Sequence, residues 1–278
     1  ANSAWGTRAG CSNGRDLLQT FLRETPDYRA AKDAGLTDDE ALKRVSSDRN
    51  LVQSVCESKT RVQADFLAMD PRNGQIKAWV GSRDFSQDPF DHVQQARRQP
   101  GSTFKPFVYA AAFEDGAKPS DTFVDKAVEI PLAGGEVWRP SDEDEPSERA
   151  ISLRDGLAYS RNRITAQLME TVGPNKVARL ARAMGVRDSE LDPVPSLALG
   201  TSPVTLKEMV SAYGTIANLG GYVEPVMVTR IEDRNGEVLA EFAPVPPKQE
   251  LPPDAARTLV DVMRDVVSRG TGSSIRSR

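Results

Sequence analysis

The stretch QPGSTFKPF, Gln99 to Phe107, places a serine three residues before a lysine, between a glycine and a proline. Proline is tolerated in the first turn of a helix, where its missing N–H is not needed. Pro106 and the apolar run after it therefore predict a helix whose first turn holds Ser102 and Lys105. Gly101 permits a sharp or positive-φ entry into this turn. Residues i and i+3 share a helix face, so the serine hydroxyl and the lysine amine can reach each other as a nucleophile and a possible base.

The composition is that of a globular chain. Its net charge does not favour binding to nucleic acid or to an anionic membrane surface. Of the 278 residues, 38% are hydrophobic and 27% are charged, and the formal net charge is -4. These values lie far from those of a disordered or strongly basic chain. The longest uncharged run in the C-terminal half, residues 209–223, has fifteen residues. It is too short to cross a bilayer, and residues 1–10 lack the features of a signal peptide.

The single histidine and the two cysteines limit the chemistry that the chain can perform. A Ser-His-Asp triad would have to use His92, which lies in a polar segment and is expected to be a surface residue. A nucleophile here would therefore rely on a lysine or a carboxylate as its base. Cys11 and Cys56 cannot form a metal cluster by themselves and are either a disulfide or two free thiols. We predict no metal and no cofactor.

Hydrophobic periodicity separates a helical N-terminal region from a mixed remainder. Residues 13–60 are predicted to be helical, with a capping box at Thr37–Glu40. The period then changes to two around an Asn-Gly turn at 73–74, and the same turn recurs at 235–236, which predicts two β-hairpins. Helices are predicted between the hairpins and over residues 253–268. Strands, a long helical block and strands again favour an α+β fold. The acidic run at 142–148 is expected to be a solvated loop.

A second motif accompanies Ser-x-x-Lys. The stretch YSRNR supplies Ser160 and Asn162 at a predicted break between two helices, where side chains can point into a cleft. A hydroxyl, an amide and an ammonium group around a nucleophilic serine suit acyl transfer, because they supply a proton relay, a hydrogen-bond donor to the substrate and a base. Ser-x-x-Lys alone is more simply interpreted as a helix cap. The second motif at this spacing favours the catalytic interpretation.

These motifs and their flanks resemble the transpeptidase domain of class A, bifunctional penicillin-binding proteins, members of the penicillin-recognising serine transferase family. The resemblance rests on ARRQPGSTFKPFVYAAAFEDG, YSRN, PSLALGTSPVTLKEMVSAYGTIANLGG and the hairpin around DRNGEVL. It covers residues 61–278 as the N-terminal and middle part of such a domain, and it implies a helical block packed on an antiparallel sheet. Residues 1–60 resemble the helical linker region before this domain, with a glycosyltransferase domain of the same polypeptide expected upstream.

The resemblance implies a peptidoglycan D,D-transpeptidase. Ser102 would be the acylated nucleophile, Lys105 its base, Ser160 the proton relay and Asn162 a ligand of the substrate backbone. Ser102 would attack the D-Ala-D-Ala end of a stem peptide, release D-Ala and pass the acyl group to an amine of a neighbouring stem. β-Lactam antibiotics mimic that dipeptide and would acylate the same serine.

The implied location is the periplasmic face of the bacterial inner membrane, with the membrane anchor in a segment outside this chain. In this oxidising compartment Cys11 and Cys56 can pair. We also expect burial and neighbouring hydrogen-bond donors to lower the pKa of Lys105.

The chain departs from the family pattern in one motif, because no Lys-Thr-Gly occurs in it. We interpret RGTG at 269–272 as a turn upstream of that motif. We therefore expect a longer polypeptide whose continuation carries Lys-Thr-Gly and the central sheet strands, and we expect residues 1–278 alone to be inactive. Two alternative functions are a serine β-lactamase and a non-catalytic β-lactam-binding sensor domain. The first needs a glutamate to position water, and Glu170 is instead interpreted as a surface charge.

Overall fold

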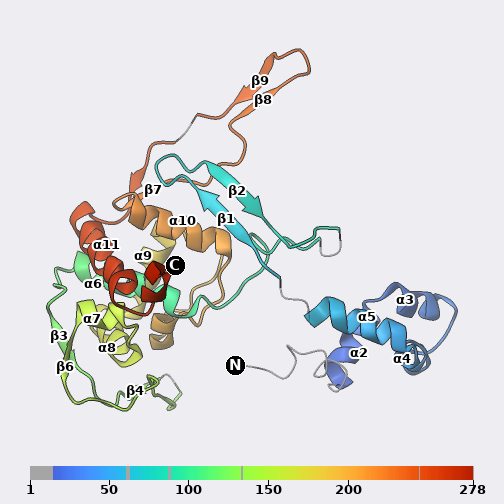
Figure 1. The fold of residues 1–278 in the computed structure, drawn as a ribbon, viewed down its shortest axis with the longest axis horizontal. Coiled ribbons are helices and arrows are strands. Elements are labelled where there is room, and N and C mark those ends of the chain that lie inside the picture. Colours follow the sequence, from blue (N-terminus) through green and yellow to red (C-terminus); the bar gives the residue numbers. More distant parts are fainter. Residues whose placement is uncertain (1–14, 61–62, 87–88, 133, 244, 278) are drawn as a thin grey trace. The chain divides into compact units, whose positions relative to one another are not determined.

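The computed structural model describes residues 15–60, 63–86, 89–132, 134–243 and 245–277. The chain divides between Gln63 and Ala64 into two compact units (Figure 1). Cys11 lies outside the described residues, so its pairing with Cys56 stays a prediction. The division into a linker region over 1–60 and part of a transpeptidase domain over 61–278 also stays a prediction.

The first unit is helical, as its periodicity predicts. Its described helices are α2 (Arg15–Arg23), α3 (Pro26–Asp33), α4 (Asp38–Ser47) and α5 (Arg49–Thr60). Their apolar faces meet in a small core built around Leu22, Leu42, Val45 and Val55. The predicted capping box is present, because the Thr37 hydroxyl accepts the Glu40 N–H and the Glu40 carboxylate accepts the Thr37 N–H.

The second unit is organised around α6, a helix buried on every side. Every residue from Lys105 to Phe113 is buried, as expected of a helix that is apolar all round. Helices α7, α8, α9 and α11 pack against it. The helices of this unit are α6 (Lys105–Glu114), α7 (Leu153–Ala158), α8 (Asn162–Val172), α9 (Pro174–Met184), α10 (Leu206–Ala217) and α11 (Pro253–Ser268), with short 3₁₀ helices η2 (Gly101–Phe104), η3 (Pro195–Leu199) and η4 (Ser273–Ser277).

The described strands of the second unit form antiparallel pairs. Both predicted hairpins are confirmed as β1 (Phe66–Met69) with β2 (Ile76–Val80) and β8 (Arg230–Glu232) with β9 (Val238–Glu241). The first hairpin lies alongside α10 (Figure 1). Three shorter pairs join segments of the loops, namely β3 (Thr122–Val124) with β6 (Ala150–Ser152), β4 (Ile130–Pro131) with β5 (Val137–Trp138), and β7 (Gly221–Tyr222) with β10 (Lys248–Gln249). Helices packed on antiparallel strands confirm the predicted α+β class.

The turn that carries Ser102 differs from the prediction. The α-helix begins at Lys105, and Ser102 lies in the preceding 3₁₀ helix η2. The Lys105 N–H donates to the Ser102 carbonyl, which is the three-residue spacing of a 3₁₀ turn. Gly101 has φ +59°, a left-handed conformation that glycine adopts without strain. The predicted positive-φ entry is therefore present, but it leads into a tighter turn than an α-helix.

Candidate active site

Ser102 is presented to solvent at the junction of η2 and α6. Its side chain is exposed, and within the described part of the chain its hydroxyl makes no hydrogen bond. The turn beneath it is fixed by its neighbours, because the Thr103 hydroxyl donates to the Pro100 carbonyl at 2.7 Å and the Tyr213 hydroxyl donates to the Thr103 carbonyl at 2.8 Å. Ser102 is therefore an accessible hydroxyl on a fixed turn at the start of a helix.

Lys105 joins the two motifs. Its side chain is fully buried, and its Nζ donates to the Ser160 carbonyl at 2.5 Å, to the Ser160 Oγ at 2.9 Å and to the Asn162 Oδ1 at 2.7 Å. An ammonium group has three donors, and each of them has an acceptor here. The structure therefore brings together Lys105, Ser160 and Asn162. It places Ser102 three residues before Lys105, with no hydrogen bond between the two side chains.

The electrostatic environment of Lys105 has two opposing parts. Burial lowers the pKa of Lys105 to about 8, and the Asp142 carboxylate acts in the opposite direction. A larger fraction of this amine is therefore neutral near neutral pH than of a free lysine, whose pKa is ~10.4. We predicted that neighbouring donors would assist this shift, which is wrong, because the groups that bind Nζ are acceptors and the nearby charge is negative.

Ser160 lies at the break between α7 and α8 in a conformation that is unusual for a side-chain-bearing residue. Its φ is +54°, in the left-handed region that costs non-glycine residues about 1–3 kcal/mol when the surroundings impose it. The turn is closed by the Ser160 N–H on the Leu157 carbonyl and the Arg161 N–H on the Gly156 carbonyl. In this conformation both oxygens of Ser160 reach Lys105. The predicted helix break around residues 159–162 is confirmed.

The acidic run is not a solvated loop where it meets this turn. The Asp142 side chain is only 6% exposed, and its Oδ1 accepts the Asn162 N–H at 2.5 Å. The Asn162 Nδ2 donates to the Ser141 carbonyl at 2.7 Å. Sequence reasoning missed this contact, because a run of acidic residues gives no sign of which member pairs with a partner twenty residues away.

Arg163 fastens the acidic segment to α8. Its side chain is 4% exposed, and its Nε lies 2.6 Å from Asp125 and 3.4 Å from Asp142. Its remaining nitrogens donate to the carbonyls of Asp144 and Glu145 at 2.9 and 3.3 Å. The guanidinium lowers the pKa of Asp125 to about 2. A buried arginine immediately after the Ser-x-Asn motif is the second group that the sequence analysis missed.

Replacing Arg163 by methionine is expected to destabilise the protein by about 3–5 kcal/mol, because it leaves the Asp125 carboxylate buried without its partner. Urea unfolding of the purified protein measures the loss. The matched control is Arg161→Met on the same helix, where a side chain with 29% exposure pairs with the exposed Asp144 and the expected cost is about 0–1 kcal/mol. Equal costs for the two variants would show that the buried pair has no special role.

The RGTG segment is a turn that follows α11 and contacts α7 and Tyr159, just before the Ser-x-Asn motif. The Thr271 N–H donates to the Ala158 carbonyl at 3.2 Å. Arg269 pairs with Asp155 at 2.7 Å and lies over the Tyr159 ring at 5.6 Å. These contacts reach the two residues that precede Ser160. They agree with the interpretation of RGTG as a turn rather than as a strand motif.

Gly270 allows this turn to approach α7, and alanine there should disturb it. A Cβ at Gly270 would lie 2.1 Å from the Ala158 carbonyl oxygen, so Gly270→Ala must displace the turn and is expected to cost about 1–3 kcal/mol. A thermal melt measures the effect. In the control variant Gly272→Ala the nearest atom, the Val266 carbonyl oxygen, is 3.3 Å away. Similar melting temperatures for the two variants would contradict the close packing.

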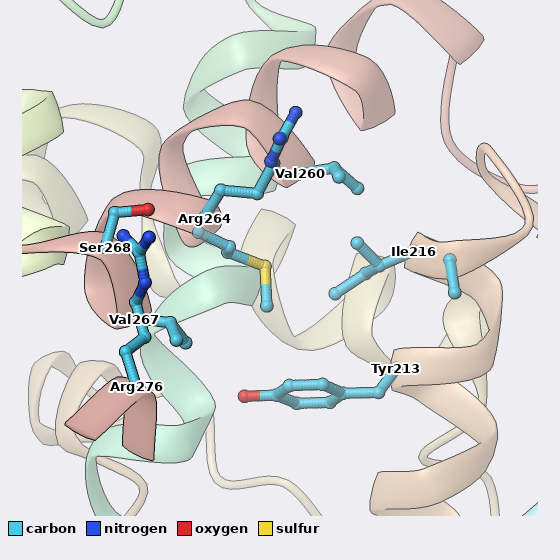
Figure 2. A pocket seen from close by; sticks show the side chains of 9 residues that line it. Tyr213, Ile216, Val260, Arg264, Val267, Ser268 and Arg276 are labelled. Carbon is cyan, nitrogen blue, oxygen red and sulfur yellow. The ribbon is translucent and has the colours of Figure 1, made fainter. Parts of the chain in front are cut away.

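A cavity of about 550 Å³ lies between α10, α11 and η4. In Figure 2 the Tyr213 ring projects from α10 toward this space, and Val260, Val267 and Arg276 surround it from α11 and η4. None of its nine lining residues belongs to either motif. The Tyr213 hydroxyl connects this cavity to the Ser102 turn through its hydrogen bond to the Thr103 carbonyl. Glu170 is exposed on α8, as expected of a surface charge.

Comparisons with known proteins agree with this site. Residues 65–277 match the model of the penicillin-binding protein transpeptidase domain. The chain is 42% identical to penicillin-binding protein 1A of Rickettsia conorii over 64% of its length. Penicillin-binding protein 1A of Haemophilus influenzae has a similar structure, with a TM-score of 0.71 and 26% identity over 77% of this chain and 38% of that one.

The chain thus belongs to the penicillin-binding protein transpeptidase domain family. The chain spans 22 to 33% of the length of the curated relatives that it matches. A further neighbour, PonA1 of Mycobacterium tuberculosis, was solved in complex with penicillin V; it is 22% identical, with a TM-score of 0.64, over 91% of this chain and 72% of that one. Among the described residues, no helix has both the length and the apolar character to cross a membrane.

Proposed function

We propose that the protein containing this chain is a peptidoglycan D,D-transpeptidase that works through an acyl-serine intermediate on Ser102. The observation that carries the proposal is the fully buried Lys105, whose amine is held by Ser160 and Asn162 within one turn of an exposed serine. A base with a pKa of about 8 is well matched to a reaction near neutral pH. The family membership supports the same reaction class.

The first half-reaction forms the acyl-enzyme. The neutral amine of Lys105 takes the Ser102 proton while the hydroxyl oxygen attacks the carbonyl carbon of the penultimate D-Ala residue of a stem peptide. The backbone N–H of Ser102, near the start of α6, stabilises the developing oxyanion. The C–N bond then breaks, and the proton passes through the Ser160 hydroxyl to the departing D-Ala amine. In the second half-reaction an amine of a neighbouring stem attacks the ester and restores the Ser102 hydroxyl.

The hydrogen bonds of Lys105 in the free protein are compatible with these proton transfers. When the ammonium loses one of its three protons, one acceptor loses its donor and the nitrogen gains a lone pair. A hydroxyl can reverse its role and an amide oxygen cannot, so Ser160 is the partner that can turn from acceptor to donor. This difference assigns proton transfer to Ser160 and orientation to Asn162. The second N–H of Asn162 Nδ2, beyond the one bound to the Ser141 carbonyl, is the group we assign to the substrate carbonyl.

The remaining parts of the proposal concern the complete protein. β-Lactams, as mimics of the terminal dipeptide, are expected to acylate Ser102, and the neighbour solved with penicillin V supports their binding in this fold. We infer that residues 1–60 precede the transpeptidase domain as a linker region and follow a glycosyltransferase domain, and that the protein acts at the periplasmic face of the inner membrane. Stem peptides and β-lactams are the proposed partners.

The lifetime of a penicillin adduct tests the function class. Benzylpenicillin should add to the complete protein once per chain and stay bound for many minutes, since Glu170 is exposed and is not placed to direct a hydrolytic water. A short-lived adduct with steady hydrolysis would instead indicate a β-lactamase. Incubation with stem peptides then separates an enzyme from a sensor, because only a transpeptidase joins two stems with release of D-Ala. A long-lived adduct without crosslinking would contradict the proposal.

A further inference from the structure

The contacts at the start of α8 single out Asp142, which belongs to neither motif. We propose that Asp142 is a positioning residue for acylation: its carboxylate caps α8 from a separate segment and thereby holds Asn162 against Lys105. This inference rests on the proposed function of Ser102 and Lys105. It assigns a role to the acidic segment that the sequence patterns leave without one.

The first step of the argument is the missing cap of α8. The N-terminal N–H groups of a helix need acceptors from outside the helix, and a side chain at the N-cap position usually supplies one. Helices α7 and α10 follow this rule with Ser152 and Thr205. In α8 the N-cap residue is Arg161, whose side chain makes no capping hydrogen bond. The structure therefore needs another acceptor at this end of α8.

Asp142 is that acceptor. Its two carboxylate oxygens accept the N–H of Asn162 at 2.5 Å and the N–H of Arg163 at 3.3 Å. Both donors lie in the first turn of α8, where a negative charge also interacts favourably with the helix dipole. The carboxylate is held in place in turn by Arg163, whose Nε lies 3.4 Å away and is anchored on Asp125. A buried carboxylate with these partners has little freedom to move.

Asn162 is consequently fixed at three points. Its backbone N–H is bound by Asp142, its Nδ2 by the Ser141 carbonyl, and its Oδ1 by the Lys105 amine. Two of the three partners, Ser141 and Asp142, are consecutive residues where the acidic segment begins. Displacement of this segment would therefore release both the backbone and the side-chain amide of Asn162, and with them one of the three acceptors that orient Lys105.

The charge of Asp142 also has a measurable effect, because it acts on the pKa of Lys105. Asp142 is the charged group whose field acts on Lys105, and it favours the ammonium form against the effect of burial. Of the charged groups nearby, Arg161, Arg163, Asp125 and Asp144 form ion pairs with one another. The remaining carboxylates of the acidic run and of α8, Glu143, Glu145, Glu148 and Glu170, are exposed. On α7 and α11, Arg154, Asp155, Asp261 and Asp265 form a separate network with Arg269, and Arg257 pairs with Asp254. On α6 itself, burial raises the pKa of Tyr109 and keeps its phenol neutral.

Two substitutions separate the capping role from the charge. Asp142→Asn keeps an oxygen that can accept the Asn162 N–H but removes the charge, so the pKa of Lys105 should fall further. The neutral amine is the base, so the acylation rate should rise with pH around this lower pKa. The midpoint of the rise should therefore move to lower pH. The expected displacement is about one pH unit, at the lower end of what a nearby opposite charge produces. Asp142→Ala removes both functions and is expected to slow acylation by about 10–100-fold over the whole pH range, as small misplacements of catalytic groups do.

The test uses the complete protein with ¹³Cε-labelled lysine, in which the chemical shift of Lys105 is followed from pH 6 to 11 and assigned by its loss in Lys105→Arg. The rate of acylation by benzylpenicillin is measured on the same samples over the pH range in which the protein remains folded. Glu143→Gln is the matched control, since it removes one negative charge from the adjacent, exposed residue. It should leave both readings unchanged, and thermal melts verify that each variant is folded.

Lys105 should titrate near pH 8 in the unmodified protein, at lower pH in Asp142→Asn, and near pH 8 again in Glu143→Gln. An unchanged Lys105 titration in Asp142→Asn would overturn the inference, as would acylation of Asp142→Ala at the full rate. The lysine titration does not depend on enzymatic activity. Penicillin labelling that persists in Ser102→Ala would therefore refute the proposed function without deciding the role of Asp142.

Discussion

Replacing Ser102 by alanine in the complete protein is expected to reduce labelling by a fluorescent penicillin to background. The substitution removes the only hydroxyl in η2 that lies one turn before Lys105, and without an oxygen nucleophile no covalent ester can form. The exposed position of Ser102 means that the protein should fold as before. Labelling is read on a denaturing gel, on which only a covalent adduct survives.

The neighbouring hydroxyl provides the control for this experiment. Thr103 lies in the same 3₁₀ turn, and its hydroxyl is engaged with the Pro100 carbonyl. Thr103→Ala removes a hydroxyl that helps to fix this turn but is not the nucleophile, so this variant should still be labelled well above background. Undiminished labelling of Ser102→Ala would end the assignment of Ser102 as the nucleophile, whatever the result for Thr103.

Replacing Lys105 by methionine is expected to lower the acylation rate by about 10²–10⁴-fold, the usual contribution of a general base. Methionine preserves most of the buried volume, so the effect reports on the amine rather than on a cavity. The unmodified protein should acylate faster as pH rises, with a midpoint near the pKa of about 8, because deprotonation produces the base. This pH dependence should disappear in Lys105→Met.

Stopped-flow kinetics with a chromogenic cephalosporin provide both the rate and its pH profile. Lys126→Met, at an exposed lysine, is the control for the loss of one positive charge and should change neither. A rate that is independent of pH in the unmodified protein, or one that Lys105→Met leaves intact, would contradict the role of Lys105 as the base.

Local patterns were sufficient to predict most of the elements that position the site. The Asn-Gly turns, the capping box at Thr37 and the break before Asn162 are encoded in neighbouring residues, and each is present in the structure. The grouping of Lys105 with Ser160 and Asn162 was predicted from the chemistry of the two motifs and from the family resemblance, not from local patterns. The lowered pKa of Lys105 was predicted in direction from burial and neighbouring donors, and of these two causes only burial lowers it in the structure.

The parts that local patterns did not predict depend on contacts between distant segments. Asp142 and Arg163 are twenty-one residues apart, and Asp125 and Arg163 are thirty-eight apart. A charged residue is usually exposed, and only the three-dimensional proximity of its partner makes burial tolerable. The 3₁₀ geometry at Ser102 has a similar origin, since Gly101 donates to the carbonyl of Gly200 on a remote loop. The spacing of residues around Ser102 does not indicate that Gly200 is a hydrogen-bond partner of Gly101.

The location of the penicilloyl group tests the central claim most directly. The complete protein is incubated with benzylpenicillin and digested with trypsin, which does not cleave before Pro106 or Pro119, so the peptide of interest runs from Gln99 to Lys126. Fragmentation in a mass spectrometer then identifies the modified residue. The account predicts one penicilloyl group per chain, on Ser102. A group on any other residue, or an unmodified Gln99–Lys126 peptide in a protein that has bound the drug covalently, would contradict it.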